Sequence, residues 1–367
     1  REETRPVLGL NGMALDASTP LPRFVIRGAG PEDLEQLLAL ARHLDTVNLP
    51  AEPRYLERLL EHSAASFAGR VADPTLCKYV FVVLDRQLGR AVGTSTLVAQ
   101  LGRKDAPYIF LDVLDDEKYS ATLDKHFEHT VLRLGFSYDG PTELAGLVLD
   151  PGYRRAPERL GLAISYVRFL FIAAHPELFQ EELLAELLPP LEPDGRSLLW
   201  EAFGRRFTGM TYSEADRLSS EDKTFIRDLF PTGIVYASLF DPDAQAVIGK
   251  VGPQTLGVER MLRRAGFRYA DRIDPFDGGP HFVADRQDVV PVRCTARRRV
   301  RSLTELGRPE LVLVGRDLPT APYFVGLSTE AELLGDEEVG IDEAICRALG
   351  VEDGAELWVQ HFRALGG

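Results

Sequence analysis

Residues 143–163 read ELAGLVLDPGYRRAPERLGLA, and this stretch decides the fold. An apolar run ends at Asp150-Pro151, a basic loop follows, and a Gly-X-Ala step at Gly161 opens a helix that we expect to run to about Ala174. The first N–H groups of a helix lack intrahelical partners, and the helix dipole adds partial positive charge there. The main chain can therefore hold a diphosphate at this turn, with countercharge from Arg154, Arg155 and Arg159. The alternative is an ordinary strand-turn-helix of an α/β protein.

The turn resembles the site at which acyl-CoA N-acyltransferases of the GNAT superfamily bind the pyrophosphate of coenzyme A. Their motif is Arg/Gln-X-X-Gly-X-Gly/Ala; here Glu158 stands three residues before Gly161, and Arg159 comes one place late. In that fold the strand before the turn splays from its neighbour, and one of its N–H groups bonds the thioester oxygen, a position that falls on Leu147. The resemblance implies a cofactor site made of Leu147, Val148, Leu149, Arg154, Arg155, Arg159, Gly161 and Ala163.

Short blocks on either side of the turn carry a second likeness, from about Phe24 to the C-terminus. They include Val25-Ile26-Arg27, Tyr79-Val80-Phe81-Val82, Arg168-Phe169, Gly204-Arg205-Arg206-Phe207, Pro253-Gln254-Thr255 and Phe276-Asp277-Gly278-Gly279-Pro280. In these blocks the chain resembles the arginine N-succinyltransferase family. The resemblance implies an enzyme of arginine catabolism that moves a succinyl group from the co-substrate succinyl-CoA to the α-amine of arginine, without a metal ion. It also implies a homodimer or a hetero-oligomer with a paralogous subunit.

The charge balance limits the partners of this chain. Lys and Arg total 42 against 56 Asp and Glu, so the formal net charge is -14 at pH 7, which disfavours a nucleic-acid or anionic-membrane partner. No apolar run approaches the roughly 20 residues that a membrane span needs, and residues 1–23 lack a signal-peptide pattern. Cys77, Cys294 and Cys346 are widely spaced and odd in number, which suits a reducing compartment. We therefore expect a cytoplasmic location.

The expected elements are those of an α/β (α+β) protein with mixed central sheets. The first part predicts strands at 24–27, 78–85, 91–101, 108–115 and 142–149, with helices at 30–44 and 53–67. Helices are then expected at 198–203, 220–230, 242–249 and 255–265, whereas 181–186 fits a strand or a helix, and strand-like runs follow at 311–314, 323–327 and 357–362. We predict a flexible extension over 1–23, a GNAT-like domain with the coenzyme A turn over 24–175, a second GNAT-like half over 176–289 and a small β-rich domain over 290–367.

Acyl transfer from a thioester to an amine requires proton handling, because the ammonium must lose a proton and the leaving thiolate must gain one. The family places a catalytic histidine two residues after a tyrosine, and the same alignment here gives Tyr236 and Ser238. Serine does not titrate near neutral pH. The best substitute is His281, which directly follows the Gly-Gly-Pro turn and would be an exposed loop residue, while Tyr236 or Tyr212 could give a proton to the thiolate.

Two other groups of histidines have weaker readings. His126 and His129 are three residues apart on what we take as a possible helix face, where they could bind a metal ion, but no third ligand is in view. His175 is expected to end the helix that follows the coenzyme A turn, where a histidine interacts favourably with the helix dipole.

The substrates imply charged partners at both ends. A succinyl carboxylate requires a fork of donors, for which Arg205, Arg206 or Arg268 are candidates, with surface arginines as the alternative. The guanidinium of arginine requires Asp or Glu, and Glu186, Asp274 and Asp277 lie in or beside the family-like blocks. Two further functions stay open: a non-catalytic or regulatory subunit that pairs with an active paralogue, and an acyltransferase that acts on a different amine such as ornithine.

Overall fold

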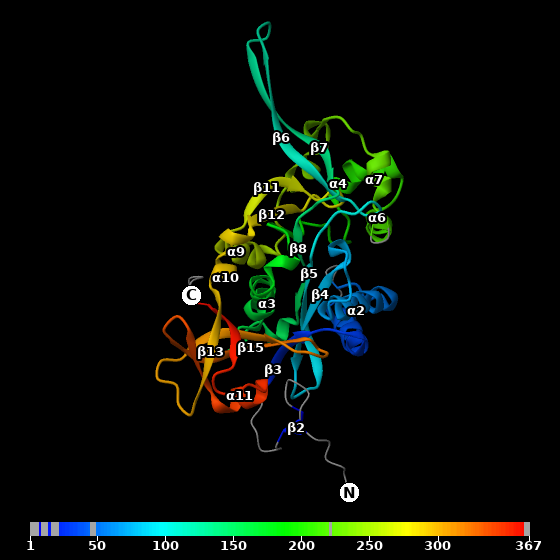
Figure 1. The fold of residues 1–367 in the computed structure, drawn as a ribbon. Helices are drawn as coiled ribbons and strands as arrows, with labels where there is room; N and C mark the ends of the chain where they lie inside the picture. Colours follow the sequence, from blue (N-terminus) through cyan, green and yellow to red (C-terminus); the bar gives the residue numbers. More distant parts are fainter. Residues whose placement is uncertain (1–6, 9–13, 16–21, 45–48, 220–221, 363–367) are drawn as a thin grey trace. The chain divides into compact units, whose positions relative to one another are not determined.

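The computed structural model describes residues 7–8, 14–15, 22–44, 49–219 and 222–362 (Figure 1). The chain forms two compact units. Unit 1 combines 1–99, 144–179 and 287–367, and unit 2 combines 100–143 and 180–286. Each unit thus joins segments that are distant in sequence, and the linear division at 24–175, 176–289 and 290–367 stays a prediction. Most of the predicted 1–23 extension, and the first two residues of the helix predicted at 220–230, lie outside the described residues.

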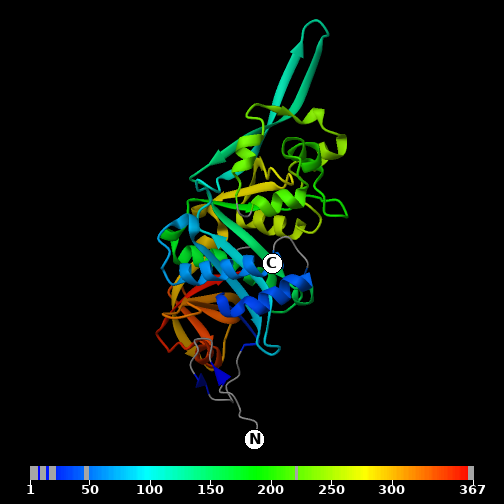
Figure 2. The same cartoon turned by 90° about the vertical axis from the view of Figure 1, so that its right-hand side faces the viewer.

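The sheet of unit 1 contains the predicted hairpin. β4 (Lys78–Asp85) pairs antiparallel with β5 (Arg90–Val98) on one side and with β3 (Phe24–Gly28) on the other. The helices α1 (Leu34–Leu44) and α2 (Pro53–Phe67), blue in Figure 2, bury one apolar face in a core cluster with β4. The predicted strand-helix-helix-hairpin order is confirmed: α1 and α2 each bury an apolar stripe, whereas β4 and β5 are buried on both faces along most of their length.

The C-terminal part of unit 1 is rich in strands. β13 (Thr295–Leu303), β14 (Glu310–Asp317), β15 (Phe324–Leu334), β16 (Glu338–Asp342) and β17 (Glu356–His361) follow one another along the chain. Sheet order continues β3-β15-β14-β17-β13-β16, with α11 (Glu343–Leu349) between β16 and β17 and α10 (Val290–Arg293) before β13. Sequence reasoning missed β13 and β16, because the arginines and other polar residues of β13 obscure its alternation.

The turn of residues 143–163 joins β8 (Thr142–Leu149) to α3 (Leu160–Ala174). Most residues of α3 are buried, and within unit 1 the helix packs against β5 and β14. The Ser95 hydroxyl donates a hydrogen bond to the Ile164 carbonyl at 2.7 Å. Among the described residues, no helix is long and apolar enough to cross a membrane.

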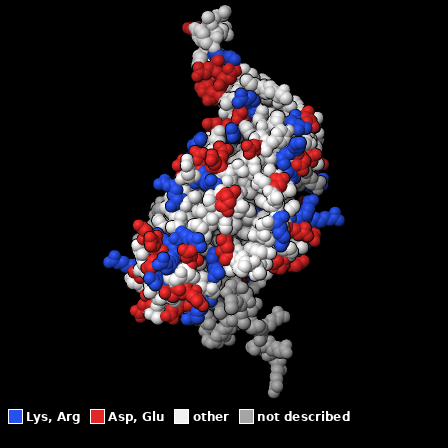
Figure 3. Space-filling model, in the orientation of Figure 1, with Lys and Arg blue, Asp and Glu red and all other residues white. Residues whose placement is uncertain are grey.

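Unit 2 is built on a second set of strands. These are β6 (Tyr108–Ser120), β7 (Lys125–Ser137), β9 (Glu182–Glu186), β10 (Val235–Tyr236), β11 (Arg268–Ile273) and β12 (Pro280–Asp285). Their order is β10-β7-β6-β11-β12-β9, and the first residues of β8 pair in parallel with β9. β6 and β7 form a long hairpin, near whose distal part acidic side chains gather (Figure 3). The ambiguous segment 181–186 is therefore a strand, and the possible helix around His126 and His129 was wrong, because β7 pairs with β6 along its whole length.

Short helices complete unit 2. They are α4 (Leu198–Ala202), α5 (Gly204–Thr208), α6 (Tyr212–Ser219), α7 (Thr224–Leu229), α8 (Pro242–Val247) and α9 (Leu256–Ala265). Their core contains Trp200, Phe203 and Phe276, with Trp200 and Phe276 stacked at 5.3 Å between ring centroids. Across both units, 3₁₀ helices span Pro31–Asp33, Pro74–Leu76, Pro151–Tyr153, Pro176–Leu178, Ala237–Leu239 and Arg286–Asp288. The predicted α/β class is confirmed by this mixture.

Candidate active site

The β8–α3 turn of unit 1 has the local geometry expected of an anion-binding helix start. The Asp150 carboxylate accepts a hydrogen bond from the Gly152 N–H at 2.9 Å, which closes the loop into a 3₁₀ turn. Arg159 caps α3 with a φ of 51°, and the helix begins at the next residue. A Cβ atom added at Gly161 would lie 3.5 Å from Leu149 Cδ2, which is an ordinary contact distance. Packing inside the protein therefore does not require glycine at this position.

The predicted cofactor residues divide by exposure. Arg154, Arg155 and Arg159 are exposed on the loop, where their charges are available to an anion. Leu147 and Leu149 are partly buried, whereas Val148 and Ala163 are buried in the core, so these two could contribute only main-chain atoms. His175 is the C-cap of α3 as predicted, and its Nε2 atom lies 3.1 Å from Asp317 Oδ1.

β8 departs from regular strand geometry immediately before Leu147. Gly146 has a φ of 56°, a left-handed conformation that glycine adopts without a steric penalty. The preceding carbonyl, that of Ala145, accepts a bond of 3.4 Å from Arg168 Nη1. Arg168 is 2% exposed, burial lowers its pKa, and its other bonds go to the carbonyl and hydroxyl of Ser165. A glycine inside a strand pattern was the sequence signal for this irregularity.

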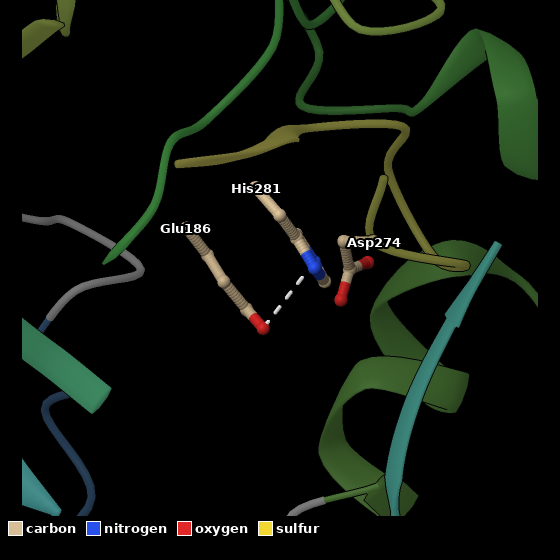
Figure 4. A group of neighbouring side chains, drawn as sticks. All are labelled: Glu186, Asp274 and His281. Carbon is tan, nitrogen blue, oxygen red and sulfur yellow. Dashed lines mark ion pairs between the residues drawn. The ribbon is translucent and has the colours of Figure 1, made fainter. Parts of the chain in front are cut away.

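A cluster of titratable side chains lies where β9 and β12 pair in unit 2 (Figure 4). His281 and Glu186 are register partners, and His281 Nε2 lies 3.4 Å from Glu186 Oε1. Asp274 completes the cluster, in which one ligand atom from each of the three residues lies within 4.8 Å of the other two. The structure thus brings together two carboxylates that the sequence could name but not place.

His281 is a buried strand residue, which corrects the expectation of an exposed loop histidine. It lies on β12 with 0% of its surface exposed, and its Nδ1 atom is 2.9 Å from the Tyr108 hydroxyl. Burial, reinforced by the positive charges of Arg272 and Lys223, lowers the pKa of His281 to about 3. The imidazole is therefore neutral at neutral pH. Pro280 opens the strand, and the alternation of β12 turns the next side chain inward.

The carboxylates of the cluster carry raised pKa values. Burial and the negative charges of Glu143 and Asp274 raise the pKa of Glu186 well above its ordinary value, although 33% of its side chain is exposed. Burial and the charge of Asp274 likewise raise the pKa of Asp277 well above the ordinary range. Burial also raises the pKa of Asp274. Raised pKa values favour the protonated carboxyl groups, so a bound cation that offsets burial and mutual repulsion would stabilise their ionised forms.

Main-chain bonds hold the acidic turn in place. The Asp274 carboxylate accepts from the N–H groups of Phe276 at 2.7 Å and of Asp277 at 3.2 Å. The Asp277 carboxylate accepts from the Gly279 N–H at 2.7 Å. Tyr212 lies against Asp277, and burial followed by the Asp277 charge raises the pKa of its hydroxyl. The turn presents its carboxylates rigidly, as a binding site requires.

Ser238 and Tyr236 lie elsewhere in unit 2. Ser238 is exposed in the 3₁₀ turn after β10, and the Tyr236 hydroxyl donates to Asp116. The sheet order β10-β7-β6-β11-β12 separates them from His281 by four strand spacings. At about 4.8 Å each, these amount to roughly 19 Å. The three residues named for proton handling are therefore not brought into one cluster.

The arginines named for the succinyl carboxylate are on the surface. Arg205 Nη1 bonds Glu201 Oε2 at 2.7 Å across one turn of helix, and Arg206 is exposed on α5. Arg268 is exposed at the start of β11. His126 Nε2 lies 3.4 Å from Glu117 Oε2, and both of these side chains are largely exposed.

Sequence reasoning missed four residues that surround the cluster, namely Tyr108, Glu143, Lys223 and Arg272. Tyr108 and His281 are 173 positions apart, and no local pattern links them. The sequence predicted a strand that begins at residue 108. That Tyr108 reaches His281 on β12 depends on how distant strands are arranged in the sheet, which is set by the tertiary structure.

Comparison with known proteins identifies the family of this chain. The sequence model of the family described as arginine N-succinyltransferase beta subunit matches residues 24–291. The arginine N-succinyltransferase of Yersinia pseudotuberculosis serotype O:3 (strain YPIII) is 33% identical over 278 residues, which cover 75% of this chain and 78% of that protein. The enzyme of the same name from Enterobacter sp. (strain 638) is 34% identical over 289 residues, or 78% of this chain and 82% of that protein.

A solved structure gives the same result. The arginine/ornithine succinyltransferase subunit AI from Pseudomonas aeruginosa superposes with a TM-score of 0.80 at 27% identity, covering 94% of this chain and 99% of that chain. The fold, the matched residues and the likeness noted in the sequence blocks therefore agree, and the chain belongs to the arginine N-succinyltransferase family.

Proposed function

We propose that this protein is an acyl-CoA-dependent N-acyltransferase that transfers the succinyl group of succinyl-CoA to the α-amine of arginine. Family membership supports the reaction class. The observation that carries the substrate assignment is the geometry of the carboxylate cluster of unit 2, where Glu186 and Asp274 converge beside His281 and main-chain N–H groups hold Asp274 and Asp277.

The chemistry of the guest follows from the charge of the cluster. A guanidinium remains charged at all relevant pH values and offers five N–H donors in a planar fork. Placed between the carboxylates, it supplies a positive charge that stabilises their ionised forms. An ornithine side chain would supply the same charge as a compact ammonium, so it is the second amine to test.

The β8–α3 turn is the proposed site for the coenzyme A thioester. The start of α3 and the exposed Arg154, Arg155 and Arg159 would hold the diphosphate. The N–H of Leu147, beside the bend at Gly146, would bond the thioester oxygen. Arg205 or Arg206 would bind the succinyl carboxylate. For Arg205 to do so, its ion pair with Glu201 must break.

Proton handling remains assigned to Ser238, Tyr236 and His281 as a proposal. Ser238 stands at the position where the family histidine is expected, so it would serve only to orient a water molecule. Tyr236, whose hydroxyl is bonded to Asp116, is the proposed proton donor to the thiolate. His281 is the proposed alternative histidine, on the strength of its contact with Glu186.

The deciding experiment measures thiol release from succinyl-CoA with arginine, ornithine and citrulline. Citrulline matches the shape of arginine but lacks its charge, so we expect turnover with arginine and at least tenfold lower kcat/KM with citrulline. Asp277→Asn keeps an oxygen for the Gly279 N–H but removes charge, and should raise the KM for arginine. Asp285→Asn, at the exposed end of β12, is the matched control. Equal activity with citrulline and arginine would reject the guanidinium site.

A second function is suggested by the names of the related proteins. The matched family is described as a beta subunit, and the P. aeruginosa protein is called subunit AI. With serine at the expected histidine position, the chain could instead be a non-catalytic partner of a paralogous subunit. Thiol release that requires co-expression of the paralogue would favour this reading.

A further inference from the structure

The Nε2 atom of His281 is a buried polar atom that has no hydrogen-bond partner among the described residues. The residue is 0% exposed, and its other ring nitrogen already meets the Tyr108 hydroxyl at 2.9 Å. Buried polar atoms in folded proteins nearly always have a partner, so an orphaned one requires an explanation. Here the atom points into the space between Glu186 and Asp274 (Figure 4).

The three donors around this space have the spacing of a metal site. One atom each from Glu186, Asp274 and His281 lies within 4.8 Å of the others, and His281 Nε2 is 3.4 Å from Glu186 Oε1. Metal ions such as Zn²⁺ bind imidazole nitrogen and carboxylate oxygen at about 2.0–2.2 Å, so two donors of one tetrahedral ion lie about 3.3–3.6 Å apart. A separation near the 4.8 Å limit must therefore shorten when an ion binds. Because 33% of the Glu186 side chain is exposed, it has room to make the small rotation needed.

The supporting contacts also match those of metal ligands. A ligating histidine usually bonds a protein group through its other ring nitrogen, and Tyr108 occupies that position. The Asp274 carboxylate is oriented by two main-chain N–H groups, those of Phe276 and Asp277. The acidic residues Glu143 and Asp277 lie near Glu186, whereas the positive charges of Arg272 and Lys223 act on His281. The arrangement of the three donor atoms, rather than the surrounding charge, therefore favours a cation.

We propose that Glu186, Asp274 and His281 bind a divalent transition-metal ion, with Zn²⁺ as the representative. One imidazole and two carboxylates form a donor set that suits Zn²⁺, and they leave a coordination position for water. This site goes beyond the proposed acyl transfer. Since the ion and a guanidinium need the same carboxylates, they bind in competition.

The test is a calorimetric titration of untagged, chelator-treated full-length protein with ZnCl₂ in the absence of coenzyme A. We expect one saturable ion per chain, and Co²⁺ should give visible absorption typical of a site with nitrogen and oxygen ligands. Both His281→Gln and Glu186→Gln should weaken binding at least tenfold. The matched control is His126→Gln, because His126 lies at the same 3.4 Å from a glutamate but in an exposed pair without a third donor.

Two results would overturn the site. One is the absence of saturable Zn²⁺ binding to the wild type. The other is a Glu186→Gln variant that folds and binds Zn²⁺ with wild-type affinity. Because the Glu186 side chain is partly exposed, we expect this variant to fold. Competition is measured separately, as a Zn²⁺-dependent rise in the KM for arginine. A protein that binds Zn²⁺ with an unchanged KM would keep the metal site and reject the arginine site.

Discussion

Substitution of Gly161 separates a role in coenzyme A binding from a role in folding. Gly161 is the second residue of α3, and an added Cβ would be at an ordinary contact distance of 3.5 Å from Leu149 Cδ2. Alanine exceeds glycine in helix propensity by about 0.8–1.0 kcal/mol in a helix interior, and by less near an end. Gly161→Ala should therefore leave the thermal midpoint unchanged or slightly raised.

The same substitution should weaken coenzyme A binding, although it does not lower the thermal midpoint. A diphosphate held by the first N–H groups of α3 needs close approach to the backbone, which a side chain at this position obstructs. We expect Gly161→Ala to raise the Kd for coenzyme A about tenfold, or about 1.4 kcal/mol, and Gly161→Val to raise it further. Calorimetry with coenzyme A and succinyl-CoA measures both.

A second glycine provides the control. Gly257 is the second residue of α9, and a Cβ there meets no atom within 4 Å. Gly257→Ala should thus have the same local effect on helix stability with no effect on coenzyme A affinity. A folded Gly161→Val variant with the wild-type Kd would refute the assignment of the diphosphate to this turn.

Two further predictions concern proton handling and acid stability. A positioned general base contributes roughly 10² to 10⁴-fold to turnover. Because Tyr236 and Ser238 lie roughly 19 Å from His281 across the sheet, we expect Ser238→His to leave steady-state thiol release unchanged if arginine binds at the carboxylate cluster, whereas a rise of about 10²-fold would place the reacting amine beside β10. For Asp85, burial opposes ionisation, but bonds from Arg23, the Leu88 N–H and the Tyr153 hydroxyl outweigh it and lower the pKa below its ordinary value. The stability that this carboxylate confers is thus present above its unfolded pKa of about 3.9 and is lost as the pH falls through the lower folded value. Asp85→Asn should lower the urea midpoint at pH 7, with a difference from wild type that shrinks toward about pH 3; a pH-independent difference would contradict the reasoning.

The elements that could be predicted are those set by neighbours in the chain. The α1 and α2 helices and the β4–β5 hairpin follow from apolar periodicity, and the start of α3 follows from the turn before it. β7 was missed because residues 125–137 are largely exposed and polar toward their start, which leaves no buried alternation to detect. Its strand conformation comes from pairing with β6.

The sequence by itself determined the family, the strand-turn-helix of residues 143–163 and the acidic residue types, because these depend on short stretches of residues. Only the tertiary structure decided which of them meet. The pairing register of β12 with β9 sets His281 against Glu186, and the placement of β6 brings Tyr108 to the other face of the imidazole. The order of the strands also places Tyr236 and Ser238 away from this cluster. β12 is buried on both faces from Pro280 to Ala284, so the burial of His281 comes from distant segments that pair with and pack around the strand, and no alternating pattern in the sequence could predict it.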